Sequence, residues 1–138
     1  MESERQIVDK QKSYSSLQEL FDDSYTRIVK QGQVCMYGSR CAYRSSDNQL
    51  GCAIGVLLSD ETINESFRFG NYKDSNIAAA LPFLEALLKN ELMCAGNIEF
   101  LSRIQTCHDC SAGNNFINNF KSQMADVAKT YRLTVPDV

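Results

Sequence analysis

The most regular hydrophobic pattern in the chain is that of an amphipathic helix beginning after Ser16. Apolar and small residues recur at the spacing of one helix face at Leu17, Leu20, Phe21, Ser24 and Ile28. Ser16 and Glu19 form a capping box, in which the serine oxygen accepts a backbone N–H and the glutamate reaches back to another. Gly32 is placed to end this helix, because glycine readily adopts the left-handed conformation found after helix C-termini.

Two further helices are predicted in the second half of the chain. Asn97 can cap the first of them, and Gly113 follows its end. Its apolar face is Ile98, Leu101, Ile104 and His108. The last helix begins near Asn114, and Pro136 lies beyond its end. Its core stripe is Phe116, Phe120, Met124, Val127 and Tyr131.

The middle of the chain is less regular. Residues 41–44 alternate, residues 45–48 are typical of a turn and residues 49–52 lead back, which predicts a β-hairpin with a four-residue loop. If Arg44 pairs with Gln49, Cys41 lies opposite Cys52. The apolar run 52–58 is either the end of this hairpin or a short helix, with residues 59–61 as its exit. Residues 62–76 are predicted to be loop, and residues 82–90 a helix that tolerates Pro82 in its first turn.

These elements predict a mainly α (α+β) fold, a compact helical domain of about five helices with one small β-hairpin. The length of 138 residues fits one domain. Residues 1–13 lack periodicity and are expected to be a flexible N-terminal tail, which leaves residues 14–138 as the single globular domain.

Composition narrows the function classes. Hydrophobic residues make up 43% and charged residues 22%, as in a globular chain, and a net charge of −3 argues against coating extended nucleic acid. No segment approaches the roughly 20 apolar residues of a membrane span, and the polar start is unlike a secretory signal. We therefore expect a cytoplasmic protein with no membrane partner, whose six cysteines are thiols or metal ligands; self-association stays open.

Two cysteine pairs are candidates for chemistry. Cys41 and Cys52 could be a redox-active thiol pair or half of a metal site, or two small apolar side chains packed under the hairpin. Cys107 and Cys110 share a helix face and could bind zinc, but a zinc site needs four ligands, and Cys35 with Cys41 would have to complete it. We assign no cofactor and keep zinc as an alternative.

His108 is the one histidine of the chain. It could serve as the base for Cys41 or Cys52, which would make the protein a thiol enzyme. The alternative is a buried histidine whose hydrogen bonds fix a loop, because His108 falls on the apolar face of its helix. Asp109 projects about 100° further around the helix and cannot orient the ring without help.

A positive segment stands out between Asp23 and Asp47, which holds no acidic residue. Its basic and aromatic residues are Arg27, Lys30, Arg40, Arg44, Tyr37 and Tyr43. Strand alternation places Arg40 and Arg44 on one face of the hairpin, near the N–H groups of a helix starting at Cys52. This arrangement suits a phosphate or carboxylate group, although a merely solvated positive surface would have the same sequence.

Three motifs resemble a family of small uncharacterised bacteriophage and prophage proteins. They are the run Cys41-x-Tyr43-Arg44, the run from Cys52 to Glu61, which includes Gly55, and the run Phe100-Leu101-x-x-Ile104-Gln105-x-x-His108-Asp109. The resemblance spans most of the chain. Departures are the extra cysteines at 35, 94, 107 and 110 and a longer stretch between Glu61 and Pro82.

The resemblance implies a phage-encoded accessory protein in a bacterial host cell. Such a protein would act without catalysis, as an inhibitor or sponge that counters a host process, including host defence. Its partner would be a host bacterial protein or a phosphorylated, nucleotide-type ligand. The candidate binding residues are Arg40, Tyr43, Arg44, Cys52, Gly55, His108 and Asp109. A thiol enzyme and a zinc-stabilised regulatory module are the alternatives.

Overall fold

The computed structural model describes residues 5–37, 40–45, 47–66, 87–89, 92, 94–111 and 113–138. Within these ranges the helices are α1 (Leu17–Gln31), η1 (Gly55–Leu57, a 3₁₀ turn), α2 (Asp60–Ser66), α4 (Ala95–Asp109) and α5 (Phe116–Tyr131). The strands are β1 (Met36–Tyr37) and β2 (Arg40–Cys41), which pair antiparallel. The mainly helical class predicted from the sequence is confirmed. The described part holds four α-helices, against the five expected for the whole chain.

Helix α1 begins and ends where the sequence predicts. The Ser16 hydroxyl oxygen accepts the Glu19 N–H at 3.1 Å, and the Glu19 carboxylate accepts the Ser15 N–H at 2.9 Å. Gly32 adopts a left-handed conformation with φ of 74° and donates its N–H to the Ile28 carbonyl. The predicted apolar face is buried from Leu20 onward, so this helix is specified by local sequence.

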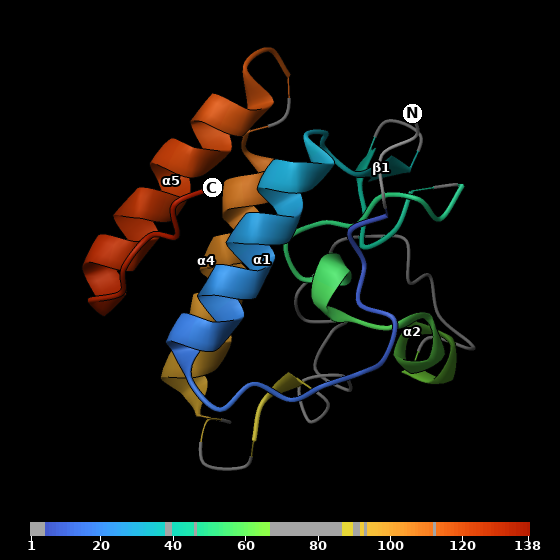
Figure 1. Ribbon diagram of the computed structural model, residues 1–138, viewed down its shortest axis with the longest axis horizontal. Helices are drawn as coiled ribbons and strands as arrows, with labels where there is room; N and C mark the ends of the chain where they lie inside the picture. The colour runs from blue at the N-terminus through green and yellow to red at the C-terminus, as the bar shows by residue number, and fades with distance from the viewer. Residues whose placement is uncertain are drawn as a thin grey trace.

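Helices α4 and α5 also carry the predicted faces. Leu101, Ile104 and His108 of α4 are buried, but the helix begins at Ala95, before the expected cap at Asn97. The α5 stripe is buried from Phe116 to Val127. Figure 1 shows α1, α4 and α5 as the long elements of the molecule, with α5 packed on both α4 and α1.

The chain between α1 and α2 differs from the predicted hairpin. The short ladder pairs Met36 with Cys41, and further along Arg44 forms an isolated antiparallel bridge with Gly51 instead of pairing with Gln49. Because a register shift changes every cross-strand partner, the expected facing pair of Cys41 and Cys52 is wrong.

The residues that follow η1, from Asp60 to Ser66, form a helix where the sequence predicted a helix exit and a loop. Ser59 caps a helix instead of ending one, since its hydroxyl oxygen accepts the Thr62 N–H at 3.2 Å. Residues 60–66 are therefore α2, where exit and loop were expected. The predicted loop at 67–76 and most of the predicted helix at 82–90 lie outside the described residues.

The N-terminal residues 5–14 form an extended strap against the domain, where a flexible tail was expected for residues 1–13. Ile7 and Val8 are 3% and 5% exposed, and the Val8 N–H donates to the Val56 carbonyl. The Tyr14 hydroxyl donates to Asp23 of α1. Apolar burial and backbone pairing hold the strap, although its sequence has no secondary-structure period. Figure 1 shows this blue segment crossing from the α2 side to the start of α1.

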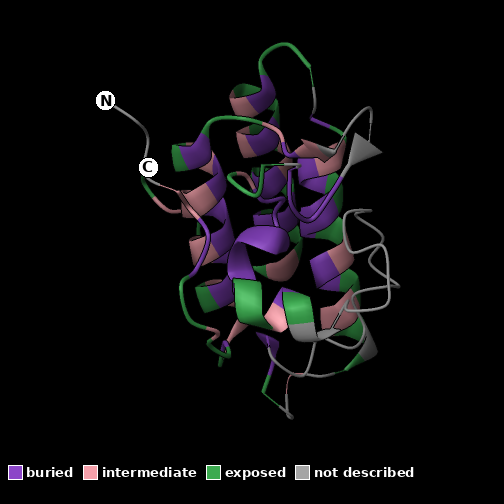
Figure 2. Ribbon diagram, turned by 90° about the vertical axis from the view of Figure 1, so that its right-hand side faces the viewer, coloured by how far each residue is buried: buried purple, intermediate pink, exposed green. Residues whose placement is uncertain are grey.

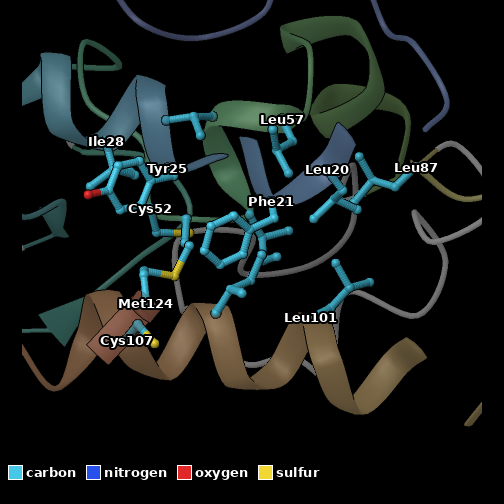
Figure 3. Packing of buried hydrophobic residues seen from close by; sticks show 14 of the residues in the cluster. Leu20, Phe21, Tyr25, Ile28, Cys52, Leu57, Leu87, Leu101, Cys107 and Met124 are labelled. Carbon is cyan, nitrogen blue, oxygen red and sulfur yellow. The ribbon is translucent and has the colours of Figure 1, made fainter. Parts of the chain in front are cut away.

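The core lies between the three long helices and η1. Figure 2 shows the buried residues on the facing sides of the elements and the exposed residues outward. In Figure 3, Leu20 and Phe21 of α1 point into the space that Leu101 of α4 closes from the other side. All three side chains are 0% exposed, so α1 and α4 pack closely against each other beside η1.

Candidate functional site

The residues of the three motifs singled out in the sequence come together around η1. Tyr43 and Arg44 precede the turn, Cys52 and Gly55 lead into η1, and His108 ends α4; all five are buried. Asp109 is intermediate in exposure. The side chains of Arg40 and Cys41 lie outside what the structure describes. Sequence motifs far apart in the chain therefore meet at one place, but mostly inside the protein.

Gly55 is required by a close backbone approach. A Cβ atom at this position would lie 2.1 Å from the Tyr43 carbonyl oxygen, far inside van der Waals contact. The Gly55 N–H also lies 3.2 Å from the Cys52 sulfur, as a hydrogen bond. The glycine thus lets η1 lie directly against the backbone of the preceding segment.

Arg44 fastens η1 to that segment from the inside. Its side chain is 1% exposed, and its two terminal nitrogens donate to the carbonyls of Gly55 at 2.7 Å and Leu58 at 2.6 Å. One of them also lies 3.2 Å from the Asp60 carboxylate. Burial lowers the pKa of Arg44, and the Asp60 charge opposes that shift. The guanidinium is therefore a structural clamp.

The strap completes this charge cluster at the surface. Arg5 reaches both carboxylate oxygens of Asp60, at 2.8 and 3.2 Å, and donates to the Asn48 carbonyl. The hydrogen bond from Arg5 lowers the pKa of Asp60, with further help from the Arg5 and Arg44 charges against the opposing effect of burial. A single carboxylate is thus shared by the strap and the buried clamp.

His108 is a second clamp, at the end of α4. The Cys35 N–H donates to its Nε2 atom at 2.9 Å, while Nδ1 lies 2.8 Å from the Asp109 carboxylate. This pattern assigns the neutral tautomer with the proton on Nδ1. The ring is 0% exposed and packs edge-on against Phe116. The alternative that His108 fixes a loop is confirmed.

The help that Asp109 needs to orient the ring comes from Gln105. The Gln105 amide nitrogen donates to the same Asp109 oxygen at 2.9 Å, and its amide oxygen accepts the Ile54 N–H at 3.2 Å. A continuous chain of hydrogen bonds thus runs from Cys35 through His108 to Ile54 at the start of η1. We call this chain, together with the Arg44 clamp, the η1 network.

The cysteines near the site are not arranged as nucleophiles. Burial raises the pKa of the Cys52 thiol to about 12, and burial also raises the pKa of the Cys107 thiol to about 12. Neither ring nitrogen of His108 contacts Cys52, because both are engaged elsewhere. The predicted Cys52–His108 dyad is therefore wrong, and the version with Cys41 falls on a side chain outside the described residues.

Two basic residues of the positive segment, Arg27 and Arg44, are held by contacts within the fold. Arg27 is bonded to Asp23 at 2.8 Å and to the Gln6 carbonyl, and Arg44 is buried, so an exposed face containing Arg44 is wrong. Lys30 is exposed, and the side chain of Arg40 lies outside the described residues. Strand alternation failed because the segment around Arg44 forms a single bridge instead of a regular strand.

The described residues show neither a cluster of metal ligands nor a membrane-spanning helix. No group of three or more His, Cys, Asp or Glu side chains in this part of the chain gathers closely enough to hold a metal ion. None of the helices described is both long and apolar enough to cross a membrane.

Sequence reasoning missed the two glutamines that tie η1 to its neighbours. Gln105 of α4 is itself buried, at 3% exposed, next to Ile104. Gln11 on the strap donates to the Leu57 carbonyl at 2.9 Å and accepts the Ser59 N–H at 2.8 Å. The signal for Gln105 was its place near the apolar face of a predicted helix. Gln11 gave no such signal, because its partners depend on the path of the strap.

The chain as a whole matches no protein family model, and it matches no curated protein and no solved structure.

Proposed function

We propose that the protein is a non-enzymatic accessory protein of phage origin that binds a host bacterial protein in the cytoplasm and blocks a host process. The phage setting and the anti-defence role rest on the resemblance carried by motifs such as Cys52 to Gly55 and His108-Asp109. Its partner class and lack of catalysis rest on the arrangement of the site.

One observation supports a role without catalysis: the reactive residue types of these motifs are engaged in holding the fold. Both ring nitrogens of His108 are occupied, and the Cys52 thiol is buried with a pKa of about 12. A base and a nucleophile need an accessible lone pair and a populated thiolate. Recognition then falls to residues on the outer surface.

A host protein is the preferred partner over a phosphorylated or nucleotide ligand. The phosphate site expected on the hairpin needed Arg44 in solvent, and Arg44 instead donates to the carbonyls of Gly55 and Leu58. A protein partner requires no such concentrated anion site, since interfaces are formed over broad, mixed surfaces.

The test compares graded expression with targeted variants in a bacterial host. Phage plating is measured on strains carrying different defence systems, with the wild type, Cys52→Ala and His108→Gln expressed at several levels. A stoichiometric inhibitor gives an effect that scales with its amount and persists in both variants, provided thermal melts show that they fold. Loss of the effect in a folded variant would indicate an enzyme.

Native mass spectrometry of the protein purified from the same host identifies the partner class. We expect a complex with a host protein in a fixed ratio. A retained nucleotide in its place would overturn the choice of partner, and no effect on any strain together with no fixed-ratio complex would contradict the proposal as a whole.

A further inference from the structure

A hollow on the outer surface runs between α4 and α5, away from the η1 network. Its volume is about 350 Å³, and both helices contribute walls. Figure 1 shows the two helices packed next to each other. The size is near the lower end of the ~300–1,000 Å³ found for ligand pockets, which suits a small molecule. We call it the α4–α5 groove.

The floor of the α4–α5 groove is apolar. Cys107 and Val127 line it, and they are 4% and 7% exposed. Because burial of the Cys107 thiol raises its pKa to about 12, this sulfur is neutral and behaves as a small apolar surface. The floor can therefore take an aliphatic group.

The rim carries three charged side chains, Glu99 and Arg103 on α4 and Asp126 on α5. Arg103 of α4 is half exposed, and among the described residues its ion pair is with Glu99, at 3.3 Å, in an exposed pair of little strength. Across the groove on α5, Asp126 is exposed, and its carboxylate forms no ion pair with any residue that the structure describes. The charges of Arg103 and Asp126 are thus available to a ligand.

This combination selects the ligand by charge. A phosphate would be repelled by Glu99 and Asp126, and a simple cation, although attracted to Asp126, would meet the Arg103 guanidinium on the facing wall. A zwitterion can pair with a charged side chain on each helix: its carboxylate accepts hydrogen bonds from the Arg103 guanidinium, and its ammonium donates to Asp126.

We propose that the α4–α5 groove is a binding site for a free aliphatic amino acid, with its carboxylate on Arg103, its ammonium on Asp126 and its side chain over Cys107 and Val127. This site is separate from the binding of a host protein proposed above and does not depend on it.

The experiment is isothermal titration calorimetry with L-leucine, L-leucinamide and N-acetyl-L-leucine on the full chain. L-leucine is expected to bind saturably, and each derivative, which lacks one charge, to bind about tenfold more weakly. Arg103→Gln should weaken L-leucine about tenfold without weakening leucinamide, whereas Asp126→Asn should weaken L-leucine without weakening N-acetyl-L-leucine. The matched controls Lys30→Gln and Asp137→Asn remove exposed charges elsewhere and should change nothing.

The NMR signals of the Val127 methyl groups provide a second readout, because L-leucine over the floor should shift them and leave those of the exposed Val135 and Val138 unchanged. Absence of saturable binding at millimolar L-leucine would overturn the proposal. So would variants that weaken all three ligands equally, or binding that leaves the Val127 signals unmoved.

Discussion

The η1 network and the α4–α5 groove use similar side chains in opposite ways. In the network, Arg44 is 1% exposed and bonded to two carbonyls, while Arg103 on the groove is half exposed and held only by an exposed carboxylate. The fold uses the two terminal nitrogens of the buried Arg44, although its Nε–H has no hydrogen-bond partner among the described residues, whereas an exposed guanidinium keeps its donors for a ligand. Where a residue is placed therefore decides its role more than its type does.

The same contrast holds for the thiols. Cys52 lies within the network with a hydrogen bond from the Gly55 N–H, whereas Cys107 lines the groove without being accessible enough to act as a nucleophile. Changes in the network should consequently affect stability, and changes on the groove rim should not.

Gly55→Ala should have the largest effect. The new methyl group would collide with the Tyr43 carbonyl at 2.1 Å, and backbone on both sides would have to move. We expect a loss above ~4 kcal/mol in the free energy of unfolding, or no folded protein at all. The measurement is urea denaturation followed by circular dichroism.

Gly96→Ala is the matched control for this substitution. Gly96 lies in the first turn of α4 with no other atom near its hypothetical Cβ, so alanine there should be neutral or stabilise the protein by ~0.5–1 kcal/mol. A Gly55→Ala protein as stable as Gly96→Ala would show that η1 does not press on the Tyr43 backbone.

Arg44→Met should be next in size. Methionine keeps an unbranched side chain but leaves the buried carbonyls of Gly55 and Leu58 without their donors. We expect a loss of about 3–5 kcal/mol in the free energy of unfolding. The comparison is Lys30→Met on the exposed surface of α1, which should stay within ~0.5 kcal/mol. If the two substitutions had equally small effects on the free energy of unfolding, the Arg44 side chain would not be a buried clamp.

The Cys52 thiol should make stability fall at alkaline pH. Its pKa is raised from 9.0 to about 12, so the folded state keeps the thiol neutral while the unfolded chain ionises above pH 9.0. Stability is therefore intact below that pH and is lost as the pH rises toward 12. Relative to Cys52→Ala, the wild type should lose about 1.4 kcal/mol per pH unit in this window.

Urea denaturation of both proteins across this range is the measurement. Taking the difference between them removes the tyrosines and lysines that titrate at the same pH. If the difference in unfolding free energy between the two proteins stayed constant with pH, the Cys52 thiol would be in contact with solvent in the folded state.

His108→Phe should have a smaller effect on stability. Phenylalanine keeps the packing against Phe116 but leaves the Cys35 N–H without an acceptor, which costs about 1–3 kcal/mol. His108→Gln, which can place an oxygen near the former Nε2 position, should recover part of the loss. Thermal melts and the exchange rate of the Cys35 amide proton distinguish the two. No change in that exchange rate would contradict the clamp.

These residues also show how far the sequence could predict the molecule. The boundaries of α1 follow from Ser16 and Gly32, and the burial of His108 follows from its helical face, because such signals lie within one or two turns of chain. The place of Arg44 and the partners of Gln11 depend on the register around Gly51 and on the path of the strap. Those are set by tertiary packing, and no local pattern encodes them.

Substitutions on the groove rim should have the smallest effect on stability and thereby complete the comparison. Arg103→Gln removes one exposed ion pair with Glu99, and Asp126→Asn removes an exposed carboxylate. Each should change the free energy of unfolding by less than ~0.5 kcal/mol, since exposed pairs on helices contribute little. Urea denaturation of both variants beside the wild type is the measurement. If either variant were destabilised as strongly as His108→Phe, the replaced charge would contribute to the stability of the fold. The α4–α5 groove and the η1 network would then not differ in how much their side chains contribute to stability.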